Sequence, residues 1–371
     1  MTLLLFVVGL ILVIYGADLL INGASRLALT FGVSPLVVGL TVVAFGTSAP
    51  ELAVSVQAAW SGEVDVSMGN VVGSNIFNVL FILGLAALIA PLIVDRMLVR
   101  RDLPVMIAAA LLLWLLALDG RIGFWDGALF FLLLLGYVAL LFRTGRDFSE
   151  AVEADDDAGD QSATQEPAVV RRHRAVWQQA GLVIAGVALM VLGSNWLVDG
   201  AVAIAVWLGV SELVIGLTIV AIGTSLPEAA TSITASIRGQ RDIAIGNVVG
   251  SNIFNIFSVL GISALVAPQG LGLLVAPELM RVDLPVMVGI TLLCLPLFYT
   301  GNLLARWEGA LLFGLYLLYV SWLVLSTRHS SAQDEFLAVL GWGVMPLLIA
   351  LVLGSLYTDH RRRAQAALPT G

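Results

Sequence analysis

The chain has 371 residues, of which 59% are hydrophobic and 12% are charged, and its mean hydropathy is +0.99. This composition excludes an ordinary soluble domain, and a formal net charge of −8 gives no support to nucleic-acid binding. We expect an all-α polytopic membrane protein, because only helices and closed barrels satisfy their backbone groups in lipid.

Apolar segments of spanning length follow one another along the chain, and each predicts a transmembrane helix. They lie at 2–24, 33–60, 66–90, 102–118, 124–142, 176–203, 210–237, 243–267, 284–299, 304–325 and 336–357. The expected organisation is therefore five helices, five more, and one extra helix at the C-terminal end.

Two segments recur at an offset of 177 residues. GLTVVAFGTSAPE (39–51) returns as GLTIVAIGTSLPE (216–228), and GNVVGSNIFN (69–78) returns unchanged at 246–255. Over 36–91, 33 of 56 positions match their partners, which indicates an internal duplication. Because each copy has five spans, the second must enter the membrane from the opposite face. Inverted repeats that meet at the midplane are typical of secondary transporters.

All 18 basic residues are arginines, and their distribution predicts the orientation. With the N-terminus outside, fifteen of them fall in inner loops or the tail, and only Arg121, Arg281 and Arg328 remain outside. The positive-inside rule favours this arrangement. We therefore expect a multi-pass protein of the inner (plasma) membrane, with the central loop and the C-terminus in the cytoplasm.

Acidic residues gather between the two copies, among Ala, Gly, Ser and Gln, which predicts a flexible cytoplasmic linker. The expected division is 1–143 for the first repeat, 144–174 for the linker, 175–325 for the inverted second repeat, and 326–371 for the extra helix and an Arg-rich tail. A solvated loop is the simpler interpretation of the acids, and a role in gathering divalent cations is the alternative.

The sequence GTS(A/L)PE interrupts the second helix of each copy. Pro50 offers no N–H to the Gly46 carbonyl, so we predict a kink or an unwound turn, and Pro227 repeats the pattern. Glu51 and Glu228 adjoin these breaks, and a carboxylate in mid-span needs a partner. Neither span contains an arginine. We therefore expect a bound cation as the partner, with a simple packing kink as the alternative.

The groups around the two breaks are all oxygen donors suited to calcium or sodium. They are the carboxylates of Glu51 and Glu228, the hydroxyls of Thr47, Ser48, Thr224 and Ser225, and freed backbone carbonyls. Soft metals are disfavoured, because the single cysteine, Cys294, is best interpreted as an apolar filler and the three histidines fall in loops or the tail.

The second motif adds further polar groups. Ser74 and Asn78 are four residues apart and so share a helical face, and Ser251 and Asn255 repeat the pair. The motif's remaining asparagines suit ion binding and interhelical bonding equally well; they are Asn70, Asn75, Asn247 and Asn252.

Glycines spaced by seven residues mark the first helix of each copy, at 9, 16 and 23 and again at 186, 193 and 200. Such a stripe gives a smooth flank against which another helix can pack or slide, and the sequence alone leaves both open. Asp18 and Asp199 lie in the same helices, and we assign them no role.

With these paired motifs the chain resembles the sodium/calcium exchangers of the calcium/cation antiporter superfamily, bacterial type with two alpha repeats. The resemblance covers residues 1–325. It implies ten helices in two inverted halves, four central ion sites in a diamond, and first and sixth helices that slide past the core, which favours the sliding interpretation of the glycines. The extra helix, 336–357, lies outside that pattern.

The resemblance also implies which residues bind the ions. The implied set is Thr47, Ser48, Glu51, Ser74, Asn78, Thr224, Ser225, Glu228 and Ser251 with the carbonyls of Ala44 and Ala221, and Glu51, Glu228, Thr47 and Thr224 are the implied metal ligands. Asn255 completes the set at a position where many exchangers carry an aspartate. The core is thereby left with two carboxylates.

We expect a calcium/sodium antiporter that exports calcium against sodium entry by alternating access, with no resident cofactor and no enzymatic activity. One calcium ion cancels two carboxylates, whereas an empty core would carry both charges across a low-dielectric barrier. A proton/calcium antiporter of the same superfamily is the first alternative, and a cation channel is the second. The expected partners are calcium, sodium or protons, and the lipid bilayer; the sequence predicts no particular protein partner.

Overall fold

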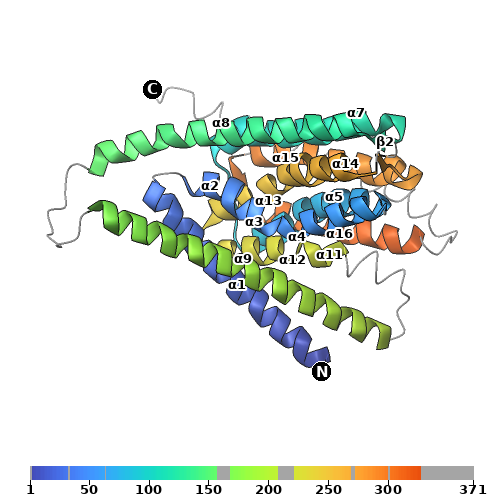
Figure 1. Cartoon of the computed structure of the whole chain (residues 1–371), viewed down its shortest axis with the longest axis horizontal. Helices are drawn as coiled ribbons and strands as arrows, with labels where there is room; N and C mark the ends of the chain where they lie inside the picture. Colours follow the sequence, from blue (N-terminus) through green and yellow to red (C-terminus); the bar gives the residue numbers. More distant parts are fainter. Residues whose placement is uncertain are drawn as a thin grey trace, which may run out of the picture.

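The computed structural model describes residues 2–31, 34–62, 64–156, 168–207, 221–268, 272–299 and 301–326. Within them the chain is helical apart from short connections and four two-residue strands, which agrees with the predicted all-α class. In Figure 1, α7 and α8 run along one edge of the molecule, α1 and α9 run along the opposite edge, and shorter broken helices lie between them.

The first half contains five helical stretches. They are α1 (Thr2–Phe31); α2 (Pro35–Val38), η1 (Gly39–Val43), α3 (Ala44–Thr47) and α4 (Ala49–Ser61); α5 (Val64–Phe77), η2 (Asn78–Leu83) and α6 (Gly84–Ile89); η3 (Leu98–Asp102), α7 (Leu103–Leu116) and η4 (Ala117–Asp119); and α8 (Phe124–Asp156). Strands β1 (Leu92–Ile93) and β2 (Arg121–Ile122) lie in the connections.

The second half repeats this order. It comprises α9 (Ala168–Trp207); α11 (Ala221–Thr224) and α12 (Leu226–Ile237); α13 (Arg241–Phe254), η6 (Asn255–Leu260) and α14 (Gly261–Val266); η7 (Leu279–Asp283) and α15 (Leu284–Tyr299); and α16 (Arg306–Ser326), with β3 (Leu273–Leu274) and β4 (Leu303–Leu304) between them. The elements η1, η2, η3, η6 and η7 are π-helical, and η4 is a 3-10 turn.

The predicted spans from 2–24 to 304–325 correspond to these stretches where the structure describes them. Of the span 210–237, only 221–237 is described, and the eleventh span, 336–357, lies outside the described residues. Among the residues that the structure describes, seven helices are long and apolar enough to cross a bilayer, and a bent pair, Pro35–Thr47 with Ala49–Ser61, makes an eighth candidate. The chain is therefore a polytopic membrane protein, as its composition predicts.

The two halves are inverted, as two sets of contacts indicate. Helices α1 and α9 are repeat mates, yet they pack antiparallel, because Gly9 meets Gly193 whereas Gly16 meets Gly186. The strands also pair across the halves, β1 with β4 and β2 with β3, and not between equivalent positions. Strand β1 follows an odd number of spans in the first half, whereas β4 follows an even number in the second. The two strands can therefore lie on the same side of the membrane only if the halves are inverted.

The glycine stripe is the contact surface between α1 and α9. A Cβ atom added at Gly16 would lie 2.7 Å from the Gly186 carbonyl oxygen, and one added at Gly193 would lie 2.7 Å from the Gly9 carbonyl oxygen. Both distances are far below ordinary contact, so only glycine allows this approach. The stripe therefore packs α1 and α9 against each other, and movement of these two helices past the core stays a prediction.

The apolar core has two parts. The larger cluster fills the body of the molecule with residues from α2 to α16 and includes no residue of α1 or α9. The smaller cluster joins α1 and α9 to the body through residues such as Leu20, Met190 and Ile243. Asp18 adds an ion pair with Arg238 at the end of α12, and Asn22 donates to Asp18 Oδ2 at 3.1 Å. The pair α1/α9 is thus packed as a unit beside the body.

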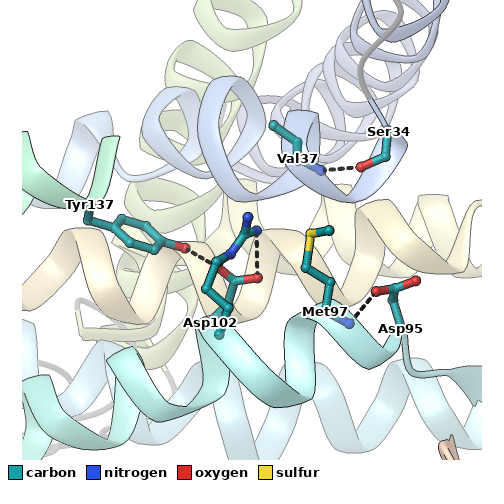
Figure 2. Close-up of polar contacts among 7 residues, drawn as sticks. Ser34, Val37, Asp95, Met97, Asp102 and Tyr137 are labelled. Carbon is teal, nitrogen blue, oxygen red and sulfur yellow. Dashed lines mark hydrogen bonds and ion pairs between the residues drawn. The ribbon is translucent and has the colours of Figure 1, made fainter. Parts of the chain in front are cut away.

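A buried aspartate fixes the start of α7 against α8. Asp102 is fully buried and accepts hydrogen bonds from Arg101 Nε at 2.8 Å and from the Tyr137 hydroxyl at 3.2 Å, as Figure 2 shows for the labelled Asp102 and Tyr137. The same view shows Ser34, whose hydroxyl accepts the Val37 N–H at 3.3 Å and caps α2. In the second half, Tyr319 donates to Asp283 at 2.8 Å in the equivalent place.

The region predicted as a linker, 144–174, is helical at both ends. Helix α8 continues to Asp156 and α9 begins at Ala168, and the flexibility of the region stays a prediction. Alanine and glutamate favour helices, so each flanking span can extend beyond the apolar segment into the acidic sequence. Only 157–167 of this region lie outside the described residues.

Candidate cation-binding site

Each half contributes a broken helix at the centre of the molecule. Helices α3 and α4 are separated at Ser48, where φ is −80° and ψ is 6°, and the two parts meet at 45°. Ser225 separates α11 from α12 in the same way, with φ −89° and ψ 9°. Pro50 and Pro227 lie in the first turns after the breaks, in agreement with the predicted kinks.

The breaks place one glutamate in the first turn of each continuing helix. Glu51 lies in the first turn of α4 and Glu228 in the first turn of α12, and both are fully buried. A helix N-terminus carries partial positive charge, which favours a carboxylate there. No cation from an arginine reaches them, because neither glutamate takes part in an ion pair within the part of the chain that the structure describes.

Each glutamate is bound by the serine of the other half. Ser48 Oγ donates to Glu228 Oε1 at 2.9 Å, and Ser225 Oγ donates to Glu51 Oε1 at 2.8 Å. Ser74, from α5, has its Oγ 2.9 Å from Ser225 Oγ. The two halves therefore share one polar centre. The duplicated motifs predicted which residues form it, but not which serine binds which glutamate.

The threonines of the two breaks form a second reciprocal set with asparagines. Thr47 Oγ1 donates to Asn247 Oδ1 at 3.1 Å, and Thr224 Oγ1 donates to Asn70 Oδ1 at 3.1 Å. Each asparagine in turn donates to the main-chain carbonyl of the glutamate in its own half, at 3.4 Å for Asn70 and 3.3 Å for Asn247. These two asparagines join helices and orient the threonines.

Two serines of this centre were not singled out from the sequence. Ser55 accepts from Asn70 at 2.9 Å, and Ser232 accepts from Asn247 at 2.9 Å. The signal that could have found them is their identity at the 177-residue offset, which sets them apart from the apolar residues around them. Ser55 and Ser232 therefore bind the two asparagines that donate to the main-chain carbonyls of the glutamates.

Several buried oxygens of the centre have no hydrogen-bond partner among the described residues. They are Glu51 Oε2, Glu228 Oε2, Asn78 Oδ1, Asn255 Oδ1 and Ser251 Oγ. A buried acceptor left without a donor is costly, with a typical penalty of about 1–3 kcal/mol. A donor set of carboxylate, amide and hydroxyl oxygens suits a hard cation such as calcium or sodium.

The backbone at the breaks differs between the halves. The Ala44 carbonyl accepts the Ser48 N–H at 3.0 Å, with Thr47 Oγ1 at 3.3 Å, whereas the Ser225 N–H donates to the Ile222 carbonyl at 3.1 Å. The Ala44 carbonyl therefore accepts two hydrogen bonds, one from the backbone and one from a side chain, which engage both of its lone pairs. Ala221 begins α11, immediately before Ile222.

The structure thus brings most of the predicted residues into two hydrogen-bonded sets, each of which crosses between the halves. One set joins Ser48 directly, and Thr47 through Asn247, to Glu228. The other joins Ser225 and Ser74 directly, and Thr224 through Asn70, to Glu51. Asn78 and Asn255 begin the π-helical segments η2 and η6, which pack against α12 and α4 respectively. Ser251 is fully buried on α13. No group of three or more His, Cys, Asp or Glu side chains suited to a metal occurs among the described residues.

Comparison with known proteins adds independent findings. The family described as sodium/calcium exchanger protein matches residues 1–143 and 179–325. A putative antiporter, CaxA of Alkalimonas amylolytica, is 42% identical over 261 residues, which cover 70% of this chain and 79% of that protein. The sodium/calcium exchanger MaX1 of Methanosarcina acetivorans is 33% identical over 347 residues, which cover 86% of this chain and 97% of that protein.

Solved structures of a sodium-calcium exchanger, NCX_Mj, match the fold. For the form soaked with sodium and no calcium, the TM-score is 0.73 at 33% sequence identity, covering 86% of this chain and 98% of that protein. A form soaked with sodium and calcium gives a TM-score of 0.72, also at 33% identity, and covers 86% of this chain and 97% of that protein. The similarity extends over nearly the whole of the solved exchanger.

Proposed function

The chain belongs to the sodium/calcium exchanger protein family, and from this premise we propose that it exports calcium against sodium entry by alternating access at the paired glutamates. Its relatives are ion exchangers and not enzymes, and exchange of calcium against another cation is the activity that they support. The direction, the coupling ion and the ligands in this chain are the proposal.

One observation carries the proposal: Glu51 and Glu228 are fully buried, come from opposite halves, and each keep one carboxylate oxygen without a hydrogen-bond partner in the described residues. Serines satisfy only the other oxygen, at 2.8 Å and 2.9 Å. Two adjacent buried carboxylates repel each other unless a cation or protons neutralise them. A cation that neutralises both must be held by both halves at once.

Charge then explains why transport is coupled. One calcium ion cancels the two carboxylates, so the loaded centre is neutral and can change its access between the two faces. The empty centre carries two negative charges, which a low-dielectric barrier opposes. Three sodium ions would leave one positive charge and make exchange electrogenic, whereas two protons would leave none. Voltage therefore distinguishes the coupling ions.

The orientation supports export. With the N-terminus outside, fifteen of the 18 arginines fall on the cytoplasmic side, together with the acidic region around 144–174. In a cell membrane with more sodium outside than inside, inward sodium movement would then drive calcium outward.

The test is calcium flux in vesicles that contain the purified full-length chain, with sodium, pH and voltage varied independently. We expect calcium uptake to require internal sodium and to respond to voltage. Flux that ignores sodium but follows a pH gradient would replace sodium by protons as the coupling ion. A calcium current that persists with no counter-ion would favour a channel and overturn the exchange mechanism.

Variants locate the site. Glu51→Gln and Glu228→Gln should each lower calcium flux by at least about two orders of magnitude, because a full charge facing a divalent ion is lost in a buried setting. Glu308→Gln is the matched control: this glutamate is also buried, at 2% exposure, but it accepts the Ala305 N–H at 2.8 Å at the start of α16. A glutamine can still accept that bond, so flux should be retained. Normal flux in either central variant would contradict the proposed ligands.

A further inference from the structure

Four buried asparagines form paired contacts across the two halves. Asn78 Nδ2 donates to Asn252 Oδ1 at 3.1 Å, and Asn255 Nδ2 donates to Asn75 Oδ1 at 3.1 Å. None of the four side chains is more than 2% exposed. The pairs are related by the same inversion as the rest of the centre, since Asn252 repeats Asn75 and Asn255 repeats Asn78.

The direction of one pair is fixed by the backbone. Asn75 Nδ2 lies 3.5 Å from the main-chain carbonyl oxygen of Asn252, and a carbonyl can only accept a hydrogen bond. The amide nitrogen of Asn75 must therefore face that carbonyl, and its oxygen must face Asn255. Because that oxygen can only accept as well, Asn255 has to present its NH2 group to Asn75.

The amides of the second pair have the same orientation, but the contact that fixes this orientation is weaker. Asn252 Nδ2 lies 3.7 Å from the sulfur of Met106, which is a weak acceptor, and this leaves Asn252 Oδ1 for the NH2 group of Asn78. Asn75 has a sulfur neighbour too, Met287, at 3.7 Å. The two halves thus use the same geometry, but only Asn75 also has a backbone carbonyl.

These contacts leave the oxygens of Asn78 and Asn255 without a hydrogen-bond partner among the described residues, although both side chains are fully buried. The segments they begin lie against the helices of the glutamates: η2 packs on α12, which carries Glu228, and η6 packs on α4, which carries Glu51. An amide turned the other way would direct its hydrogens, and not its oxygen, toward a bound cation.

We propose that Asn75 and Asn252 are positioning residues that hold the amides of Asn255 and Asn78 with their oxygens directed at the transported cation. The inference rests on the proposed function, since it assumes that a cation occupies the glutamate centre. It also explains why an amide suits position 255: a carboxylate there could not donate to Asn75 Oδ1 and would place two acceptor oxygens against each other.

The experiment compares Asn75→Leu with the unchanged chain, both full length and in vesicles, by measuring initial calcium flux against calcium concentration. Leucine has nearly the same size but cannot orient Asn255. We expect the apparent KM for calcium to rise by about tenfold or more, the usual effect of removing a group that orients a metal ligand, with a smaller change in kcat. Asn252→Leu should raise KM less, because its anchor to Met106 is the weaker one.

Two controls separate orientation from general damage. Thr291→Val alters another buried side chain, which donates to the Met287 carbonyl of its own helix at 2.7 Å, and it should leave KM unchanged. In a background of Asn255→Leu, Asn75→Leu should add no further rise in KM, because its effect passes through Asn255; independent packing damage would add. If the leucine variant fails to fold, Asn75→Ser can replace it in the same test, because a serine side chain is too short to reach Asn255.

The outcomes separate the two proposals. If the unchanged chain exchanges calcium and Asn75→Leu keeps its KM, the positioning role is wrong while exchange stands. A full additional rise in KM in the Asn255→Leu background would also overturn the positioning role. If the unchanged chain moves no calcium under any gradient, the proposed function itself fails.

Discussion

Substitution of Gly186 by alanine should separate α1 from α9. The new Cβ atom would lie 2.7 Å from the Gly16 carbonyl oxygen and 2.7 Å from the Leu20 amide nitrogen. Both are backbone atoms, which cannot rotate away, and each distance is about 0.7 Å short of ordinary contact. The helices must therefore move apart along their whole contact.

The magnitude can be isolated with a second alanine on the same helix. Gly181 has no atom within 4 Å of its Cβ position, so Gly181→Ala gains the helix preference of alanine over glycine without a clash. Gly186→Ala gains the same helix preference but also introduces a steric clash with the backbone of α1. The difference in unfolding free energy between the two variants should thus equal the overpacking cost, roughly 1–3 kcal/mol.

The measurement is unfolding of the purified variants in one detergent, by heat or by denaturant, followed by fluorescence. Gly186→Ala should be less stable than Gly181→Ala by the stated amount, and Gly16→Ala should behave like Gly186→Ala because it meets the same contact from the other side. Since the two glycines share one contact, the double variant should cost less than the sum of its parts. Equal stability of Gly186→Ala and Gly181→Ala would show that α1 and α9 are not in close contact.

Two further predictions concern ligand and charge. Calcium at about 100 times its dissociation constant should stabilise the folded chain by about 2.7 kcal/mol, and this gain, measured by thermal unfolding, should disappear in Glu51→Gln; an unchanged gain would place the calcium elsewhere. Among the ion pairs, Arg238→Gln should cost no more than about 1 kcal/mol, because its side chain is 37% exposed. Asp102→Ala should cost about 3 kcal/mol or more, because it leaves Arg101, only 14% exposed, without its carboxylate. Chemical denaturation of both variants checks the order, and a reversed order would contradict the burial argument.

Much of this architecture is predictable from local chemistry and the duplication. The apolar segments predict the helices, and the GTS(A/L)PE sequence predicts the breaks at Ser48 and Ser225, because proline removes a donor at a known position. The odd number of spans in each copy predicts the inversion that the α1/α9 contact and the strand pairs display.

Pairing across the halves is the part that local rules do not supply. The bond from Ser48 to Glu228 joins residues 180 positions apart, and only the packing of α3 on α12 brings them together. The π-helical segments are a second example. Asn78 begins η2, so the regular helical spacing from Ser74 ends there, and the two side chains find different partners, Ser225 and Asn252.

Identical motifs make the centre nearly symmetric, and this sets a sharp expectation for paired variants. Glu51 and Glu228 each accept a hydrogen bond from the serine of the other half, so these matching contacts predict that Glu51→Gln and Glu228→Gln impair calcium flux to the same degree. The Asp18–Arg238 pair has no counterpart, since the equivalent positions are Asn195 and Ser61. A difference between the two glutamate variants must therefore originate in contacts that lack a counterpart, such as this ion pair or the contact of Ser74 Oγ with Ser225 Oγ. Repeating the comparison in Arg238→Gln tests the ion pair directly. If the contact between Arg238 and Asp18 causes the difference in flux, that difference should shrink in this background.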